Sequence, residues 1–170
     1  LYDLAMKTGA PVIGLIDSAG LRLQEATDAL NAFGEIYFKQ TLASGVIPQI
    51  TAIFGNCGGG LGLFPTLTDF TFMEEKNAKL FVNSPNALDG NTVAKCDSAS
   101  AAFQSTESGI VDVVADEATV IAQIRELVGF LPANNEEDAF AEEVTDDLNR
   151  VNAELANCVG DTSVALSIIA

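Results

Sequence analysis

Hydrophobic and polar residues follow two patterns along the chain: short apolar runs, and longer segments with apolar residues at every third or fourth position. A short apolar run bounded by turn residues is typical of a buried strand, and the longer spacing is typical of a helix. Strands are predicted at residues 11–17, 47–55, 69–74, 78–83 and 109–115. Helices are predicted at residues 25–44, 58–67, 98–106, 116–131 and 146–159. Strands and helices that alternate over short connections predict an α/β fold with a parallel sheet.

Residues that are common at helix ends support two of these predicted helices. Asp116 is the expected N-cap of the helix at 116–131, and acidic residues fill its first turn. Pro132 is expected to end that helix, and Gly45 is expected to close the helix at 25–44.

Beyond residue 132 the chain becomes polar and acidic. Seven acidic residues and no basic residue occur between positions 136 and 147. This change of composition predicts a domain at 1–132 and an acidic linker at 133–147, with the start of a second domain or a connecting helix at 148–170.

Composition restricts the chemistry that the chain can perform. The formal net charge is −16, with 24 Asp and Glu against 8 Lys and Arg, which argues against nucleic acid as a partner. The chain has no histidine, so it cannot form a Ser-His-Asp or Cys-His catalytic group by itself. Its three scattered cysteines disfavour a zinc site and fit a reducing, cytoplasmic compartment. No apolar run reaches the roughly 18 residues of a membrane span.

Two turns are the candidate site because each follows a predicted buried strand. The first is "DSAGLRLQE" (17–25) and the second is the glycine-rich "FGNCGGGLGLFP" (54–65). Ligands of open α/β sheets bind outside the carboxyl ends of the strands. Both turns lead into predicted helices, whose first N–H groups are unpaired, and glycines let a substrate oxygen approach the backbone closely. These features are compatible with an oxyanion hole made of backbone amides.

Several residues of these turns allow a second interpretation. The glycines could serve tight packing of helix on sheet, or a dinucleotide-binding GxGxxG. Arg22 could pair with Glu25 or contact a ligand phosphate. Asp17 could be a turn residue or an acid–base group, and Cys57 could be a packed thiol or a nucleophile.

Four stretches together resemble one known family: "DSAGLRLQE", "FGEIYFKQTLASGVIPQI", "FGNCGGGLGLFPTLTDFTFM" and "LFVNSPNAL". They are similar to the carboxyltransferase subunits of biotin-dependent acyl-CoA carboxylases and decarboxylases, a branch of the crotonase superfamily. The resemblance implies a crotonase-like α/β superhelix core, with residues 1–132 as part of the acyl-CoA-binding domain. It further implies that 148–170 begins the biotin-side domain.

The resemblance also implies the site and its partners. The amides of Gly59 and Gly60 would hold the thioester oxygen as the enolate forms, and Ala19, Gly20, Leu21, Arg22 and Gly58 would line the acyl-CoA pocket. Leu21 stands where the family usually has a small residue, so it would narrow the pocket or turn into the core. The implied cofactors are carboxybiotin on a carrier protein and a coenzyme A thioester substrate. The implied partners are the biotin carboxyl carrier protein, biotin carboxylase or membrane decarboxylase subunits, and further copies of this chain.

The resemblance leaves the direction of the reaction open between carboxylase and decarboxylase, and it allows membrane association through partner subunits. The early strands of the family's first domain and most of the biotin-side domain have no counterpart in this sequence. We therefore expect the chain to be a fragment that is inactive alone. A hydratase or isomerase of the crotonase fold, or a non-catalytic assembly module, remains the alternative function.

Overall fold

The computed structural model describes residues 1–18, 20–87, 97–138, 145, 147, 149–157, 160 and 162–169. The chain folds into two compact units, Leu1–Phe140 and Ala141–Ala170.

The first unit is built on a four-stranded sheet with the order β1-β2-β4-β6. These strands are β1 (Val12–Ile16), β2 (Gln49–Ile53), β4 (Phe70–Glu74) and β6 (Val113–Ala115), and every neighbouring pair is parallel. Two further strands, β3 (Asn56–Gly58) and β5 (Lys79–Phe81), form a second, smaller parallel sheet. The predicted α/β architecture with a parallel sheet is therefore confirmed.

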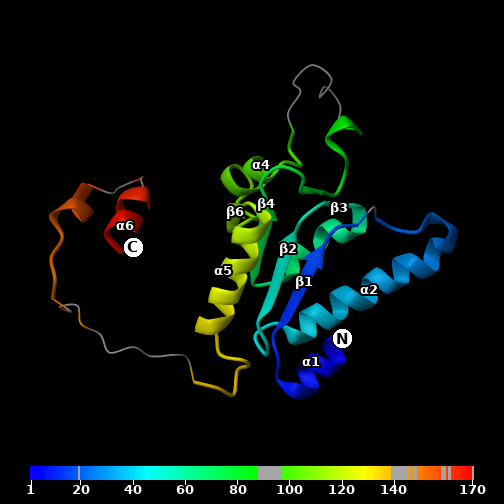
Figure 1. The fold of residues 1–170 in the computed structure, drawn as a ribbon, viewed down its shortest axis with the longest axis horizontal. Coiled ribbons are helices and arrows are strands. Elements are labelled where there is room, and N and C mark those ends of the chain that lie inside the picture. The colour runs from blue at the N-terminus through cyan, green and yellow to red at the C-terminus, as the bar shows by residue number, and fades with distance from the viewer. Residues whose placement is uncertain are drawn as a thin grey trace. The chain divides into compact units, whose positions relative to one another are not determined.

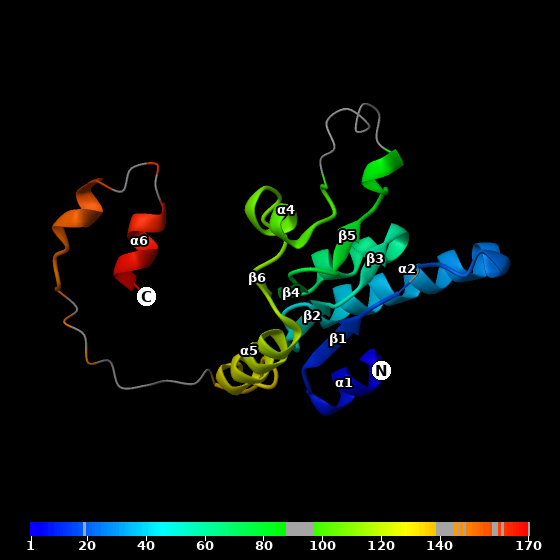
Figure 2. The same cartoon turned by 45° about the horizontal axis from the view of Figure 1, so that its top comes forward.

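Helices cover both faces of the larger sheet. The long helix α2 (Ala26–Ala43) lies on one face and α5 (Glu117–Phe130) on the other, as both views show (Figure 1, Figure 2). The shorter helices are α1 (Tyr2–Thr8), which contacts α2, and α4 (Ala101–Thr106), which contacts β5 and β6. Single 3-10 turns occupy Leu23–Glu25, Pro65–Leu67 and Pro85–Ala87, and a longer 3-10 helix occupies Gly59–Leu63.

Strand β2 shows why its sequence is continuously apolar. All five of its residues are buried, because successive side chains of a strand point to opposite faces and both faces are covered. Ile50 and Ala52 pack with Phe72, Val120 and Ile124 beneath α5. On the other face, Ile53 joins a core with Ile16, Cys57, Met73, Ala78, Leu80, Ala101 and Val111.

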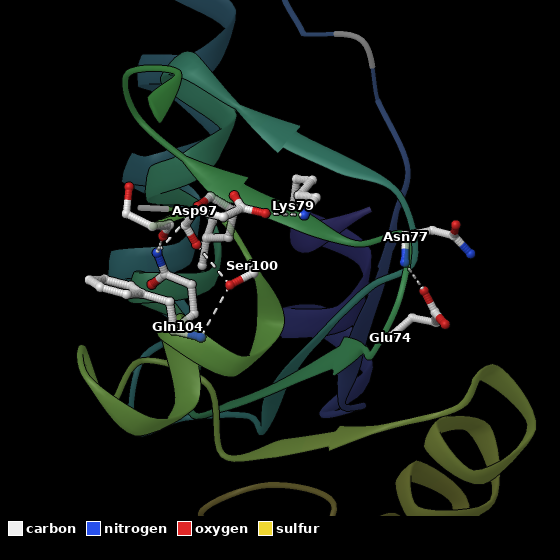
Figure 3. Close-up of polar contacts among 9 residues, drawn as sticks. Glu74, Asn77, Lys79, Asp97, Ser100 and Gln104 are labelled. Atoms are coloured by element: carbon white, nitrogen blue, oxygen red, sulfur yellow. Dashed lines mark hydrogen bonds and ion pairs between the residues drawn. The ribbon is translucent and has the colours of Figure 1, made fainter. Parts of the chain in front are cut away.

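Polar contacts hold β5 against α4 (Figure 3). Lys79 pairs with Asp97 at 2.6 Å, and the amide of Gln104 donates to the Leu80 carbonyl at 3.3 Å and to the Ser98 carbonyl at 2.6 Å. The Ser100 hydroxyl caps α4 by accepting from the backbone N–H of Phe103 at 3.3 Å. These bonds fix the strand that carries Phe81, which forms one wall of the site described below.

Several predicted boundaries hold and others do not. Asp116 caps α5 by accepting from the Thr119 N–H at 3.1 Å, as predicted. The predicted helix at 58–67 is two short 3-10 helices, and the predicted strand at 109–115 contains only β6. Gly45 follows α2 with φ +72°, the left-handed conformation expected of a glycine behind a helix.

The second unit contains a 3-10 helix, Ala153–Asn157, and the helix α6, Thr162–Ile169. The prediction of one helix over 146–159 is therefore wrong for the described residues. Side chains compete with the helix there, because Asp147 accepts from the Asn149 N–H and Asn152 from the Glu154 N–H, both at 2.9 Å. Residues 146, 148, 158 and 159 lie outside the described residues.

Candidate functional site

The two turns chosen from the sequence lie side by side because their strands are neighbours. β1 pairs with β2 in parallel, with Ile16 opposite Ile53, so the carboxyl ends of the two strands meet at one edge of the sheet. Pairing continues beyond the strands. The Ser18 N–H donates to the Asn56 carbonyl at 2.8 Å, and the Asp17 carboxylate accepts from the Asn56 N–H at 3.3 Å.

A cleft of about 520 Å³ opens between the two turns. It is lined by Ser18, Gly20, Leu21, Asn56, Gly58, Gly59, Gly60 and Phe81. An adjoining hollow of about 400 Å³ shares the first turn and carries Arg22 and Glu25. The structure thus gathers Gly20, Leu21 and the three glycines of the second turn around one cleft, with Arg22 beside it. Ala19 lies outside the described residues.

Leu21 and Gly20 form the first side of the cleft. Leu21 is half-buried and lines both the cleft and the hollow. Gly20 has φ +97°, and its N–H donates to the Ser18 hydroxyl at 3.2 Å. A residue with a side chain rarely adopts that backbone conformation, so the turn depends on glycine here.

Gly59 needs to be glycine for its backbone conformation alone. Its φ is +64°, yet a Cβ built on it would meet no heavy atom within 4 Å. It begins the 3-10 helix Gly59–Leu63, and the first N–H groups of a helix have no acceptor inside that helix. The amides of Gly59 and Gly60 therefore stand at the wall of the cleft without an intrahelical partner.

Aromatic rings crowd the positions of Gly58 and Gly60, severely at Gly58 and mildly at Gly60. A Cβ on Gly58 would lie 2.6 Å from the ring of Phe81, and a Cβ on Gly60 would lie 3.0 Å from the ring of Phe33. The Tyr37 hydroxyl also donates a hydrogen bond to the Gly60 carbonyl. Residues of β5 therefore pack against one side of the glycine loop, and residues of α2 pack against the other side.

Phe33 and Tyr37 are the residues that sequence reasoning missed. They are four positions apart on the predicted helix, a spacing that places two side chains on one helical face. That spacing predicts a common face, but the sequence does not show that the face meets the glycine loop.

The charged and reactive side chains near the cleft have structural partners. Arg22 pairs with Glu25 at 3.0 Å, with side chains that are 76% and 52% exposed, so the pair adds little stability and the guanidinium stays open to solvent. Cys57 is fully buried, and desolvation raises the pKa of its thiol to about 12. A thiol of that pKa stays protonated at neutral pH, which favours the packed thiol over the nucleophile.

The described lining of the cleft contains no carboxylate and no basic side chain, and the chain contains no histidine. The described residues hold no cluster of three or more side chains that could bind a metal ion. None of the helices in the described part has the length and hydropathy that a membrane crossing requires. The chemistry that this described lining can offer is therefore hydrogen bonding from backbone amides, from the Ser18 hydroxyl and from the Asn56 side-chain amide.

Known proteins match nearly the whole chain. The family model of the carboxyl transferase domain matches residues 1–165. The α subunit of methylmalonyl-CoA decarboxylase from Veillonella parvula is 44% identical over 164 residues, which cover 94% of this chain and 32% of that protein. The carboxyltransferase subunit of propionyl-CoA carboxylase from Haloferax mediterranei is 44% identical over 165 residues, 95% of this chain and 32% of that protein. The chain thus spans about a third of the length of these relatives.

A solved structure shows the same fold. Transcarboxylase 12S with hydrolysed methylmalonyl-coenzyme A bound superposes with a TM-score of 0.75 and 34% sequence identity. The match covers 85% of this chain and 29% of that chain.

Proposed function

Because this chain belongs to the carboxyl transferase domain family, we propose that it forms the acyl-CoA-binding part of a biotin-dependent carboxyltransferase. The observation that carries the proposal is the cleft between the first turn and the glycine loop, whose wall includes the amides of Gly59 and Gly60, which have no acceptor inside their own 3-10 helix. Relatives that act on propionyl-CoA or methylmalonyl-CoA indicate a short-chain acyl-CoA as the substrate.

The cleft has the size and character that such a substrate requires. Small-molecule sites usually measure about 300–1,000 Å³ and combine apolar walls with a few polar groups. Here Leu21 and Phe81 supply apolar walls for a short acyl group, and Arg22 stands at the adjoining hollow, where it can meet a phosphate of coenzyme A.

The amides of Gly59 and Gly60 act on the thioester. Removal of a proton or carboxyl group next to the thioester places negative charge on its oxygen. Two N–H donors that already point at that oxygen stabilise the charge without reorganisation, and each such donor contributes about 2.7–4 kcal/mol to the transition state. Gly58 allows the loop to approach closely because it carries no side chain against Phe81.

The carboxyl group and the nitrogen that carries it belong to carboxybiotin on a biotin carboxyl carrier protein, which the proposal places outside this chain. The residues of this chain bind the thioester, orient its α-carbon and hold its oxygen. This division of labour agrees with a cleft whose described lining has no side-chain acid or base.

The proposal includes partner subunits and a homo-oligomer. The match to transcarboxylase 12S, whose structure is a hexamer assembly in a multienzyme core, supports both. Biotin carboxylase or membrane decarboxylase subunits would decide the direction of the reaction. We place 1–132 in the acyl-CoA-binding domain, 133–147 in a linker, and 148–170 at the start of the biotin-side domain. Glu25 is paired with Arg22 and does not line the cleft, which counts against a hydratase or isomerase that would use a glutamate there.

The test is carboxyl transfer by the complete subunit that contains these residues. The subunit is incubated with methylmalonyl-CoA and biocytin, and the formation of propionyl-CoA is followed by chromatography. The proposal predicts turnover that requires biocytin. Acyl-CoA binding without biocytin-dependent turnover would contradict it.

A matched pair of variants locates the site. Gly59 and Gly109 have φ values of +64° and +67°, and in both a Cβ would meet nothing within 4 Å. Substitution by Ala should therefore destabilise both positions by a similar amount, about 1–2 kcal/mol. Only Gly59→Ala should also lower carboxyl transfer, because Gly109 lies between α4 and β6, away from the cleft. Equal activity of the two variants would contradict the placement of the site.

A further inference from the structure

Side chains of α2 restrain the glycine loop from behind. Three consecutive glycines, 58–60, have more backbone freedom than any other sequence of that length. A Cβ built on Gly59 would meet no heavy atom within 4 Å, so the packing of a side chain cannot restrain the loop at this position. Within residues 58–62, the side-chain hydrogen bonds come from the Tyr37 hydroxyl to the Gly60 carbonyl and from the Cys57 thiol to the Leu61 carbonyl at 3.4 Å. Just beyond this segment, the Gln40 amide of α2 donates to the Phe64 carbonyl at 3.1 Å.

The phenol is the stronger restraint of the two. A thiol is a weak donor, whereas the tyrosine hydroxyl is a full hydrogen-bond donor. The Tyr37 ring is itself held, because it stacks on Phe33 with ring centroids 6.2 Å apart and planes inclined by 10°. The Phe33 ring in turn occupies the space beside Gly60.

We propose that Tyr37 is a positioning residue whose hydroxyl holds the Gly60 carbonyl and thereby restrains the orientation of the Gly60 amide for the substrate oxygen. A peptide group is planar, so a fixed Gly60 carbonyl also fixes the N–H of Leu61 in the opposite direction. The Gly60 amide is separated from that carbonyl by the two backbone bonds at the Gly60 Cα, so holding the carbonyl narrows the range of orientations open to the amide. The catalytic part of this inference rests on the proposed function, whereas the restraint on the loop does not.

Tyr37 acts through the loop and not on the substrate. It does not line the cleft, and its hydroxyl is committed to the Gly60 carbonyl. Burial raises the pKa of Tyr37 above its ordinary value, so the hydroxyl remains a protonated donor at neutral pH.

Two measurements on Tyr37→Phe test the proposal in the complete subunit. Phenylalanine keeps the ring on Phe33 and removes only the hydroxyl. Tyr2→Phe is the matched control, because Tyr2 and Tyr37 are the two tyrosines of this chain and Tyr2 lies in α1, outside the cleft.

The first measurement is amide hydrogen exchange over residues 58–62 without substrate. Loss of one hydrogen bond should raise exchange in this segment about five- to tenfold in Tyr37→Phe, and leave it unchanged in Tyr2→Phe. Unchanged exchange in Tyr37→Phe would overturn the proposal, whatever the enzyme's activity.

The second measurement is the kinetics of carboxyl transfer. Tyr37→Phe should lower kcat about tenfold with KM for the acyl-CoA within twofold of wild type, because a displaced amide weakens contacts made in the transition state. A role in packing alone predicts lower stability with kcat unchanged, and that result would overturn the positioning role. If the wild-type subunit shows no biotin-dependent turnover, the proposed function fails, and the exchange measurement still decides whether Tyr37 fixes the loop.

Discussion

Substitution of Gly58 by Ala tests whether the wall of the cleft is packed as described. The added Cβ would lie 2.6 Å from both Cε2 and Cζ of Phe81 and 3.3 Å from its Cδ2. Carbon atoms in contact are normally about 3.5–4.0 Å apart, so the overlap is about 1 Å and the ring must move. Overpacking of this kind costs about 1–3 kcal/mol. For a chain of 170 residues that corresponds to a fall in Tm of about 2–12 °C.

A double-mutant cycle assigns this cost to one contact. Leucine at position 81 has no atoms at the places of Cε2 and Cζ, so Phe81→Leu should relieve the overlap. The structure predicts that the double variant is more stable than the sum of the single effects by about 1 kcal/mol or more, measured by urea or thermal unfolding.

Gly34→Ala is the control for the cycle. Gly34 lies in the middle of α2, and a Cβ there meets nothing within 4 Å. It should raise the free energy of unfolding by about 0.5–1 kcal/mol, because alanine favours the helix. Strictly additive effects of Gly58→Ala and Phe81→Leu would show that the two residues do not touch, and the described wall of the cleft would be wrong.

Three further predictions concern charge, reactivity and activity. Backbone hydrogen bonds, first of all from the Asn77 N–H, lower the pKa of Glu74. Wild type and Glu74→Gln should therefore be compared by urea unfolding between about pH 6 and pH 3. Wild type should be more stable above the pKa that Glu74 has in the unfolded chain, and this difference should vanish as the pH falls through the lowered pKa of the folded chain. A difference that stays constant with pH would contradict this. Because the pKa of the Cys57 thiol is raised to about 12, peptide mass spectrometry should find Cys57 unmodified when the folded chain meets iodoacetamide, and rapid labelling would disprove the burial. The 170-residue chain alone should show no biotin-dependent carboxyl transfer, and clear turnover in the biocytin assay would refute its dependence on other segments.

The fold could be predicted where local pattern and burial agree. Strand β2 is buried on both faces, so its sequence is a continuous apolar run that needs no knowledge of its partners. The cap at Asp116 is equally local. Strand β3 was not predicted, because it has three residues, two of them Asn and Gly, and exists by pairing with β5 more than twenty positions away. Helix α1 was also missed, and none of its residues is buried.

The sequence could predict where the candidate site lies, but it could not predict which residues pack against the glycine loop. The two turns follow buried strands, and the order of parallel strands brings them to one edge of the sheet. The residues that grip the glycine loop, Phe33 and Tyr37 from α2 and Phe81 from β5, come from segments whose relation to the loop is set by tertiary packing. A glycine-rich sequence shows that something must approach closely, and the structure shows which neighbours do.

The role proposed for the Gly60 amide is to stabilise charge on the thioester oxygen, and a comparison of Gly60→Pro with Gly60→Ala tests that role. In both variants the added Cβ would lie 3.0 Å from the Phe33 ring, so both must displace that ring slightly. Only proline also removes the N–H. Proline suits this place, because position 60 lies in the first turn of a 3-10 helix where the N–H has no intrahelical acceptor.

The measurement is kcat for biotin-dependent carboxyl transfer in the complete subunit, with the Tm of both variants recorded. Gly60→Pro should lose about 100- to 1,000-fold more kcat than Gly60→Ala, the usual effect of removing one oxyanion donor. Equal kcat values in two folded variants would rule out this role, because the amide at position 60 would then contribute nothing to the reaction.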